Sequence, residues 1–391
     1  MPLFLYVLGL AVFAQGTSEF MLSGLVTGIA HDLSVPVGAA ASLTSAYAVG
    51  MIVGAPVMAV SSARWPRRRA LAGFLTGFVV AHGVGAVTTD FAVLFGTRVV
   101  AAIANAGFLA VAMTVASTLV VPAKRARAIA VLLSGVTLAC VVGVPAGALL
   151  GGWAGWRSVF WAVAALCLPA LGLVFRSAPA DAAGRHDVSV RREGRTLRSC
   201  AVRSALALAT LVNAATFAAF AYLAVVATDV TRLPAGAVPG LLAAFGVGAF
   251  AGVNAAGRSA DGRLGRGMLL ALCALSAGWA VLALAGTHPV PLFVLTTVQG
   301  GLSFGIGSAL VHRVLHVAAD APSLNGAFAT VALNTGAFVG PLLAGAATET
   351  TGDYRDAVWV SAALAATALV VAAGAHRDTG ARPAVTPSAP Q

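Results

Sequence analysis

One acidic side chain, Glu19, lies inside a long apolar stretch near the start of the sequence. It is the only carboxylate between Leu3 and Ala30. A helix that rises about 1.5 Å per residue would place Glu19 about 24 Å from Leu3 and about 20 Å from Asp32. A carboxylate at that depth in a membrane costs several kcal/mol, so we expect it to serve a function such as carrying a proton.

Other polar side chains extend the same face of this helix. Gln15 precedes Glu19 by four residues, and Ser23 and Thr27 follow it at the same spacing, which aligns all of them along one face. We therefore expect one helix that faces a polar cavity inside a bundle. Arg98 is the only charged companion that the apolar runs offer to Glu19. The two residues could couple protons, or they could form an architectural salt bridge.

The composition independently indicates a membrane protein. Of 391 residues, 59% are hydrophobic and 9% are charged, with a mean hydropathy of +0.92. So little charge cannot cover a soluble protein of this length. About twelve spanning helices are predicted from the uncharged runs. These runs cover residues 3–30, 38–60, 70–88, 91–120, 128–151, 158–175, 204–228, 238–257, 268–286, 290–311, 323–347 and 357–375, with Arg98 the main exception.

The basic residues predict the orientation in the membrane. With the N-terminus inside, the cytoplasmic loops would hold most of the arginines, and the external loops would hold only Arg157, Arg232 and Arg355. By the positive-inside rule, both termini of this multi-pass protein are cytoplasmic and the membrane is the inner (cytoplasmic) one. The net charge of +11 is thereby explained by a lipid bilayer as partner, without any nucleic acid.

One polar segment divides the chain. We interpret residues 177–203 as a cytoplasmic linker between two six-helix halves, residues 1–176 and 204–376, followed by a cytoplasmic tail at 377–391.

An internal repeat supports this division. A shift of 198 residues aligns Gly50 and Gly54 with Gly248 and Gly252. Two halves of one design are typical of transporters that bind their substrate near the membrane midplane.

Loop residues after the second helix of each half provide a family resemblance. Segment 257–266, with Asp261, Arg263 and Arg266, resembles the loop signature of the major facilitator superfamily, where such side chains hold helix ends together on the cytoplasmic side. The corresponding first-half loop keeps Arg67 and Arg68 but lacks the aspartate. The resemblance implies that both loops take part in gating.

Two helix motifs are similar to those of exporters in the same superfamily. Arg98, Asn105 and Gly107 resemble the fourth-helix pattern of its drug antiporters, and Gly143, Pro145 and Gly147 resemble the fifth-helix motif that marks exporters. Glycine and proline in mid-helix allow bending and close approach. We expect this stretch to pack closely against the opposite half and to seal one side of the cavity.

The resemblance extends over essentially the whole chain outside the linker and tail. Segments 16–25, 43–50 and 54–56 resemble the twelve-helix drug:proton antiporters, and segments 105–112, 143–152 and 156–161 most resemble actinobacterial chloramphenicol-resistance exporters. This implies an all-α membrane fold and a monomer that exports a small, largely apolar drug, chloramphenicol above all. The proton gradient would supply the energy, with no cofactor and no metal. Candidate cavity residues are Gln15, Ser23, Tyr47, Asn105, Asn213 and Phe217.

Two alternatives stay open at this point. The chain could export sugars or nucleosides with protons, or it could be a membrane enzyme that uses Glu19 as a catalytic acid. Residues 301–305 spell Gly-x-Ser-x-Gly, but they lie within a predicted helix and not at a strand-to-helix turn. The single lysine, Lys124, belongs to no phosphate-binding loop. We therefore expect a secondary active transporter and not an enzyme.

Overall fold

The computed structural model describes residues 3–61, 65–118, 120–121, 125–177, 194–258, 266–320 and 324–380, and the regular structure in this part of the chain is helical. The α-helices are α1 (Leu3–Phe20), α2 (Val26–Asp32), α3 (Val37–Ser61), α4 (Arg67–Val87), α5 (Phe91–Thr118), α6 (Arg125–Leu138), α7 (Val144–Ala154), α8 (Trp156–Ser177), α10 (Cys200–Val225), α11 (Val238–Arg258), α12 (Arg266–Ala285), α13 (Pro289–Val317), α14 (Asn325–Thr351) and α15 (Arg355–Gly380). Short 3₁₀ turns occur at Met21–Gly24, Arg195–Arg198 and Ala235–Ala237, and π-helical turns at Ala139–Gly143 and Val226–Val230.

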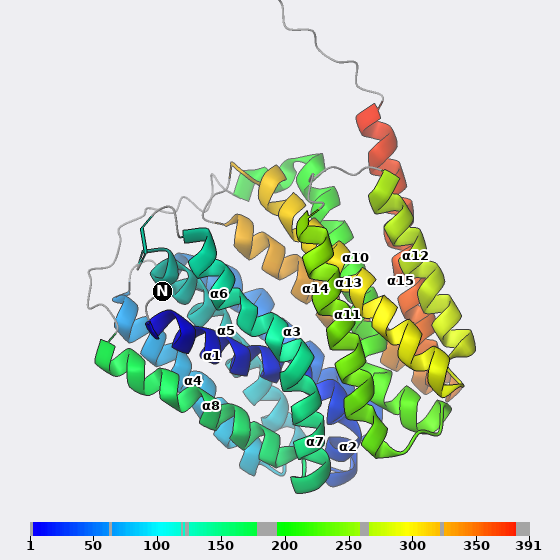
Figure 1. Ribbon diagram of the computed structural model, residues 1–391, viewed down its shortest axis with the longest axis horizontal. Coiled ribbons are helices and arrows are strands. Elements are labelled where there is room, and N and C mark those ends of the chain that lie inside the picture. Colours follow the sequence, from blue (N-terminus) through cyan, green and yellow to red (C-terminus); the bar gives the residue numbers. More distant parts are fainter. Residues whose placement is uncertain are drawn as a thin grey trace, which may run out of the picture.

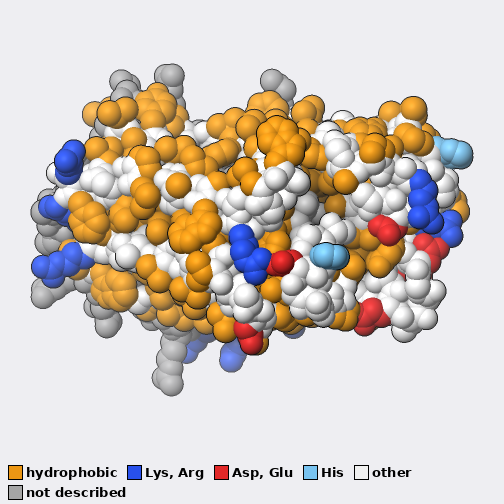
Figure 2. All heavy atoms as spheres, turned by 90° about the horizontal axis from the view of Figure 1, so that it is seen from below, with side chains coloured by type: hydrophobic (Ala, Val, Ile, Leu, Met, Phe, Trp, Pro, Cys, Tyr) orange, Lys and Arg blue, Asp and Glu red, His pale blue; other side chains and the backbone are white. Residues whose placement is uncertain are grey.

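Twelve helical segments among the described residues are long and apolar enough to cross a membrane, which confirms the number predicted from the sequence. Hydrophobic side chains cover much of the face shown in Figure 2, and charged side chains gather there in a few places. Such a surface suits a hydrocarbon environment, because lipid tails, unlike water, impose no cost on exposed apolar groups.

The helices form two bundles, α1 to α8 and α10 to α15, which lie side by side (Figure 1). We call these the N-terminal and C-terminal halves. α8 ends at Ser177 and α10 begins at Cys200, so the second half starts slightly earlier than the expected residue 204. α15 continues to Gly380, beyond the expected boundary at 376.

The same helix pair packs through glycine in both halves. Gly50 and Gly54 of α3 lie against the backbone of α5 around Val99 and Ile103. Gly248 and Gly252 of α11 lie against the backbone of α13 around Thr297 and Gly301. A side chain at any of these four glycines would push the two helices apart. The repeat read from the sequence therefore corresponds to a repeated helix contact.

The two halves touch through α3 with α14 and through α11 with α7 and the preceding π-helical turn. The Ser45 hydroxyl donates a hydrogen bond to the carbonyl of Phe338 across 2.9 Å. Further along α14, the Glu349 carboxylate occupies the space where a Cβ on Gly38 would lie. The 3₁₀ turn that follows α1 also touches the opposite half, through α10.

The first spanning segment is not one helix, contrary to our expectation. α1 ends at Phe20, a 3₁₀ turn covers Met21–Gly24, and α2 starts at Val26. Gly24 lies directly against Ala148 and Leu242. The chain changes its pitch here because a regular helix with larger side chains would not fit between these neighbours.

Candidate functional site

Glu19 lies in the last turn of α1, one residue before the helix gives way to the 3₁₀ turn. Its side chain is partly buried. It forms no hydrogen bond and no salt bridge with any residue that the structure describes. A carboxylate inside a spanning segment without such a partner is unusual, because its desolvation is not compensated.

Arg98 of α5 is fully buried beside this position. Its guanidinium donates two hydrogen bonds to Ser18, one to the hydroxyl at 2.8 Å and one to the backbone carbonyl at 2.6 Å. It also lies over the ring of Tyr47, 4.6 Å from the centroid, an arrangement that stabilises a cation by about 0.5–2 kcal/mol. Arg98 interacts with Glu19 electrostatically, but the two do not form the architectural salt bridge considered above.

A histidine completes this polar network. The Ser18 hydroxyl lies 2.7 Å from Nε2 of His82, and Nδ1 of His82 lies 2.9 Å from the carbonyl of Phe78. Since a carbonyl only accepts, Nδ1 carries the proton and Nε2 accepts from Ser18. The Ser18 oxygen is then free to accept from Arg98. This chain of bonds requires a neutral His82, and it fixes the guanidinium close to Glu19.

Sequence reasoning missed Ser18 and His82. A signal for His82 was present, since a titratable side chain inside the apolar run 70–88 is as unusual as Glu19. Ser18 carried no comparable signal, because small hydroxyl residues are common in membrane helices.

Three of the predicted cavity residues lie in the N-terminal half near Arg98. Gln15 is buried, and neither atom of its amide has a hydrogen-bond partner. The Tyr47 hydroxyl is also unpartnered, while the Asn105 amide contacts the sulfur of Met51 at 3.8 Å. Unpaired buried amide and hydroxyl groups are costly unless water or a ligand binds them. These side chains are therefore suited to hold polar groups of a substrate.

Two further predicted cavity residues use their polar atoms elsewhere. The Ser23 hydroxyl donates to the carbonyl of Phe20 at 3.1 Å, which satisfies a carbonyl at the end of α1. The Asn213 amide donates to the carbonyl of Leu333 at 2.6 Å and so attaches α10 to α14. Asn213 thus has a packing role within the C-terminal half.

Five phenylalanines form a cluster between the halves. Phe217 and Phe220 come from α10, Phe245 from α11 and Phe304 from α13, whereas Phe20 comes from the N-terminal half. We call this the aromatic cluster. Of its members, the sequence predicted only Phe217. The cluster gives the site a large apolar surface directly beside Glu19.

The glycine and proline motif lies where the fifth spanning segment becomes irregular. A π-helical turn at Ala139–Gly143 precedes Pro145, which has no N–H to donate to the previous turn. A Cβ on Gly143 would overlap the side chain of Thr17 in α1. The motif therefore lets this segment approach α1 closely.

The stretch that holds this motif packs against α11 of the opposite half, as expected, through the π-helical turn and α7, but Gly147 itself does not line that contact. The atoms nearest to its Cβ position belong to Val159 and Met21, both in the N-terminal half. The close approach between halves involves Gly246 of α11, which lies against the backbone of Cys140. Gly147 is displaced from that contact because it lies about two helical turns further along the segment than Cys140.

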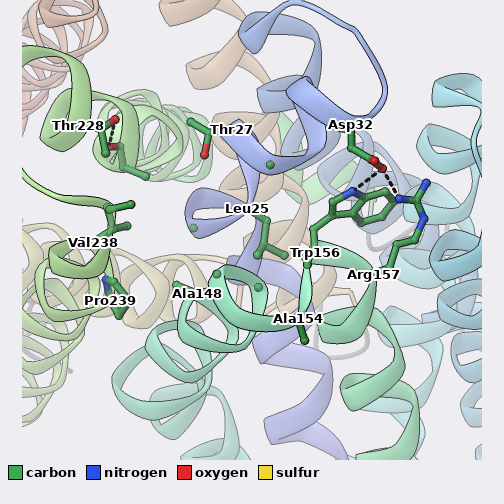
Figure 3. Close-up of a pocket in the computed structure, with 17 residues that line it drawn as sticks. Leu25, Thr27, Asp32, Ala148, Ala154, Trp156, Arg157, Thr228, Val238 and Pro239 are labelled. Carbon is green, nitrogen blue, oxygen red and sulfur yellow. Dashed lines mark hydrogen bonds and ion pairs between the residues drawn. The ribbon is translucent and has the colours of Figure 1, made fainter.

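A larger cavity of about 400 Å³ lies between the halves at α2, α7, α8 and α11 (Figure 3). Thr27 and Leu25 line it from one side and Val238 and Pro239 from the other. Cavities of about 300–1,000 Å³ accommodate drug-sized molecules. The sequence did not predict this cavity.

An ion pair borders this cavity. Asp32 accepts hydrogen bonds from Arg157 and from the indole of Trp156, the latter at 3.0 Å. Arg157 also donates to the carbonyl of Thr88 at 2.9 Å, so it joins the ends of α2, α4 and α8. The hydrogen bond from Arg157, followed by that from Trp156, lowers the pKa of Asp32 below its ordinary value.

The predicted gating loops are described only in part. Arg67 and Arg68 begin α4, and Arg266 begins α12. Asp261 and Arg263 lie outside the described residues. Among the residues that are described, no three His, Cys, Asp or Glu side chains lie close enough together to hold a metal.

Comparison with known proteins identifies the family. The Major Facilitator Superfamily profile matches residues 8–329. A chloramphenicol resistance protein of Streptomyces lividans is 52% identical over 375 residues, which cover 95% of this chain and 96% of that protein. The inner membrane transport protein YdhP of Escherichia coli (strain K12) is 32% identical over 371 residues, 94% of each chain. Among solved structures, a bacterial homologue of the human lysosomal transporter Spinster, inward-facing and occupied, has a TM-score of 0.74 at 15% identity over 98% of both chains. At 15% identity, this similarity shows the fold alone.

Proposed function

The chain belongs to the major facilitator superfamily, and from this premise we propose that it exports a small, largely apolar drug, chloramphenicol above all, in exchange for protons. As a member of that family it is a multi-pass membrane transporter and not an enzyme. Drug export of this kind confers antibiotic resistance by lowering the drug concentration in the cell.

One observation carries the coupling proposal: Glu19 is a carboxyl group that no described residue holds by a hydrogen bond or salt bridge, and it lies next to Ser18 of the Arg98 network and to Phe20 of the aromatic cluster. Ser18 and Tyr47 already engage the guanidinium of Arg98. The carboxyl group is therefore available to take up and release a proton. A group already held in a salt bridge would first have to break that bond.

Protonation of Glu19 changes the charge balance of the site. The ionised carboxylate is attracted to Arg98, while the neutral acid is better tolerated beside apolar rings. A proton that arrives from outside would favour one arrangement of Glu19, and a substrate in the cavity would favour the other. The halves would rock about the site, so that proton and drug occupy it in turn.

The substrate proposal rests on the relative and on the residues at the site. The relative that shares 52% of its sequence is named a chloramphenicol resistance protein. Chloramphenicol is neutral and combines one aromatic ring with hydroxyl and amide groups. The aromatic cluster suits the ring, and the unpaired groups of Gln15 and Tyr47 suit the polar part.

The membrane arrangement follows from charge. The arginine asymmetry supports cytoplasmic termini, and a relative is named an inner membrane transport protein. We therefore propose an inner-membrane location with both termini cytoplasmic, and from the family resemblance a monomer whose halves, α1 to α8 and α10 to α15, move relative to each other about the linker that joins them.

Export in inverted membrane vesicles tests the proposal. With an imposed pH gradient, the wild-type protein is expected to accumulate radiolabelled chloramphenicol and to release protons in proportion. Glu19→Gln keeps the size and hydrogen-bonding capacity of the side chain but cannot titrate, so uphill export should be lost while drug binding persists. Asp229→Asn is the matched control, because Asp229 is an exposed carboxylate at the end of a spanning segment; it should export normally.

Three results would contradict parts of this proposal. Wild-type export by Glu19→Gln would assign proton coupling to another group. Transport of sugars or nucleosides without chloramphenicol would replace the substrate and leave the family unchanged. Recovery of chemically altered drug from cells that express only this protein would contradict efflux as the source of resistance.

A further inference from the structure

Phe20 is the one member of the aromatic cluster that the N-terminal half contributes. Its ring is stacked on Phe217 at 5.8 Å between centroids and lies 6.4 Å from Phe220 and 6.3 Å from Phe304. The other four rings also contact one another, with 4.8 Å between Phe220 and Phe245. The C-terminal half thus forms an aromatic pocket, and a side chain of the opposite half occupies it.

Little space is left in this pocket. The cavity among the five rings, Cys140 and Thr216 measures about 10 Å³, roughly the minimum for a single water molecule. A substrate ring can therefore enter only if a resident ring leaves. Phe20 is the candidate for the ring that leaves. The other four rings belong to helices of one half, and those helices pack against one another.

The backbone at Phe20 permits such a movement. α1 ends at this residue and a 3₁₀ turn follows. Beyond the turn, no continuous α-helix holds the ring in place. The carbonyl of Phe20 is bonded locally to the Ser23 hydroxyl, so the turn can shift with its own hydrogen bond intact.

We propose that Phe20 is an internal occupant of a binding subsite for a neutral aromatic ring, and that the ring of the substrate displaces it. The subsite consists of Phe217, Phe220, Phe245 and Phe304. Phe304 is only partly buried, whereas the other three rings are buried, so we assign the entry of a substrate ring to the side of Phe304. This inference rests on the proposed function and specifies which part of a drug the site recognises.

Displacement of Phe20 also couples the binding of substrate to the release of a proton from Glu19. Glu19 is the preceding residue, so a backbone shift of the turn that withdraws the ring would also move the carboxyl group relative to Arg98. Substrate binding would then release a proton without any direct contact between the drug and Glu19. A substrate that lacks an aromatic ring would leave Phe20 in place and would not trigger this release.

Equilibrium binding of radiolabelled chloramphenicol to the purified full-length protein in nanodiscs tests the proposal. Phe20→Ala and Phe20→Leu remove the competing ring, so chloramphenicol should bind roughly tenfold more tightly, since each aromatic pair contributes on the order of a few-fold to tenfold. Proton release on binding should fall in both variants. Phe217→Ala removes part of the subsite and should weaken binding by a similar factor. Phe95→Ala removes a ring that pairs with Phe91 outside the aromatic cluster and should change neither quantity.

A competition measurement tests the ligand class. 4-Nitrobenzyl alcohol should displace chloramphenicol, whereas cyclohexylmethanol, which has a similar size and no aromatic ring, should not. If both Phe20 variants weaken binding as Phe217→Ala does, Phe20 is part of the wall and displacement is wrong, although the proposed function stands. If the folded wild-type protein binds no chloramphenicol, both the proposed substrate and this subsite are overturned.

Discussion

Replacement of Gly246 by alanine tests whether close contact between α11 and the fifth spanning segment is required for transport. A Cβ at this position would lie 2.8 Å from the carbonyl carbon of Cys140 and 2.9 Å from Cα of Val141. Both are backbone atoms, so no side chain can rotate away and the helices must separate. Overpacking of this kind costs about 1–3 kcal/mol. The population of the arrangement described here should therefore fall on the order of tenfold to a hundredfold.

Gly147→Ala provides the matched control. The atoms nearest to its Cβ position are Cγ1 of Val159 at 3.3 Å and Cβ of Met21 at 3.8 Å. The closer one is the end of a side chain, which can adjust by a few tenths of an ångström. We expect this variant to insert, bind drug and export at nearly the wild-type rate, whereas Gly246→Ala should lose at least about nine-tenths of export.

Spin labels can measure the population directly. Labels would be attached to cysteines introduced at Thr89 and Thr287, which are exposed and lie in loops of different halves. The exposed native Cys200 and Cys273 would first be replaced. Electron–electron distance distributions in nanodiscs should shift in Gly246→Ala and stay unchanged in the control. A variant that keeps both its distances and its export rate would refute the reasoning, because the backbone clash would then have been absorbed without separating the halves.

Two further predictions concern the polar contacts. His82→Ala leaves the buried Ser18 hydroxyl without an acceptor, at a cost of about 1–3 kcal/mol, and should change the pH profile of drug export. His82→Gln, whose amide can accept that hydrogen bond, should restore the wild-type profile. An unaltered profile in His82→Ala would show that Arg98 does not need the support of His82. Asp32→Asn removes an exposed ion pair worth up to about 1 kcal/mol. Because Arg157 lowers the pKa of Asp32, the stabilisation exists above the pKa of the unfolded state and disappears as the pH falls through the lower folded value. Thermal melting should therefore distinguish wild type from Asp32→Asn at pH 7, and the difference should vanish once the pH is below the lowered pKa of the folded state. A difference that persists at such acidic pH would exclude the ion pair as its cause.

The fold was predictable from the sequence because the membrane restricts the length and the composition of each spanning helix. Each spanning helix must be apolar over a fixed length, so hydropathy alone located all twelve candidate spans. The alignment of Gly50 with Gly248 was readable for the same reason, because close backbone contacts demand glycine in each copy. Glu19 was detectable because its charge conflicts with its surroundings.

Details of the site depended on contacts between distant helices and could not be derived in this way. The turn after Phe20 forms where Gly24 meets Ala148 and Leu242, three segments that no local pattern connects. Asn213 looked like a cavity residue, yet its amide donates to the carbonyl of Leu333 on α14, a contact that no local pattern indicates. A phenylalanine every few dozen residues is likewise ordinary in a membrane helix, so the aromatic cluster had no signature in the sequence.

Glu19 and Phe20 are neighbours, and this explains how one small movement can serve two purposes. Successive side chains of an α-helix point about 100° apart, so Glu19 can interact with Arg98 of its own half while Phe20 enters the aromatic cluster of the other. In the middle of a regular helix, rotation of this pair would strain backbone bonds in the turns on both sides. Here the 3₁₀ turn begins directly after Phe20, so the strain is confined to one side. The irregular turn therefore lets a ring in the cavity and a proton on the carboxyl group act on each other through the backbone that they share.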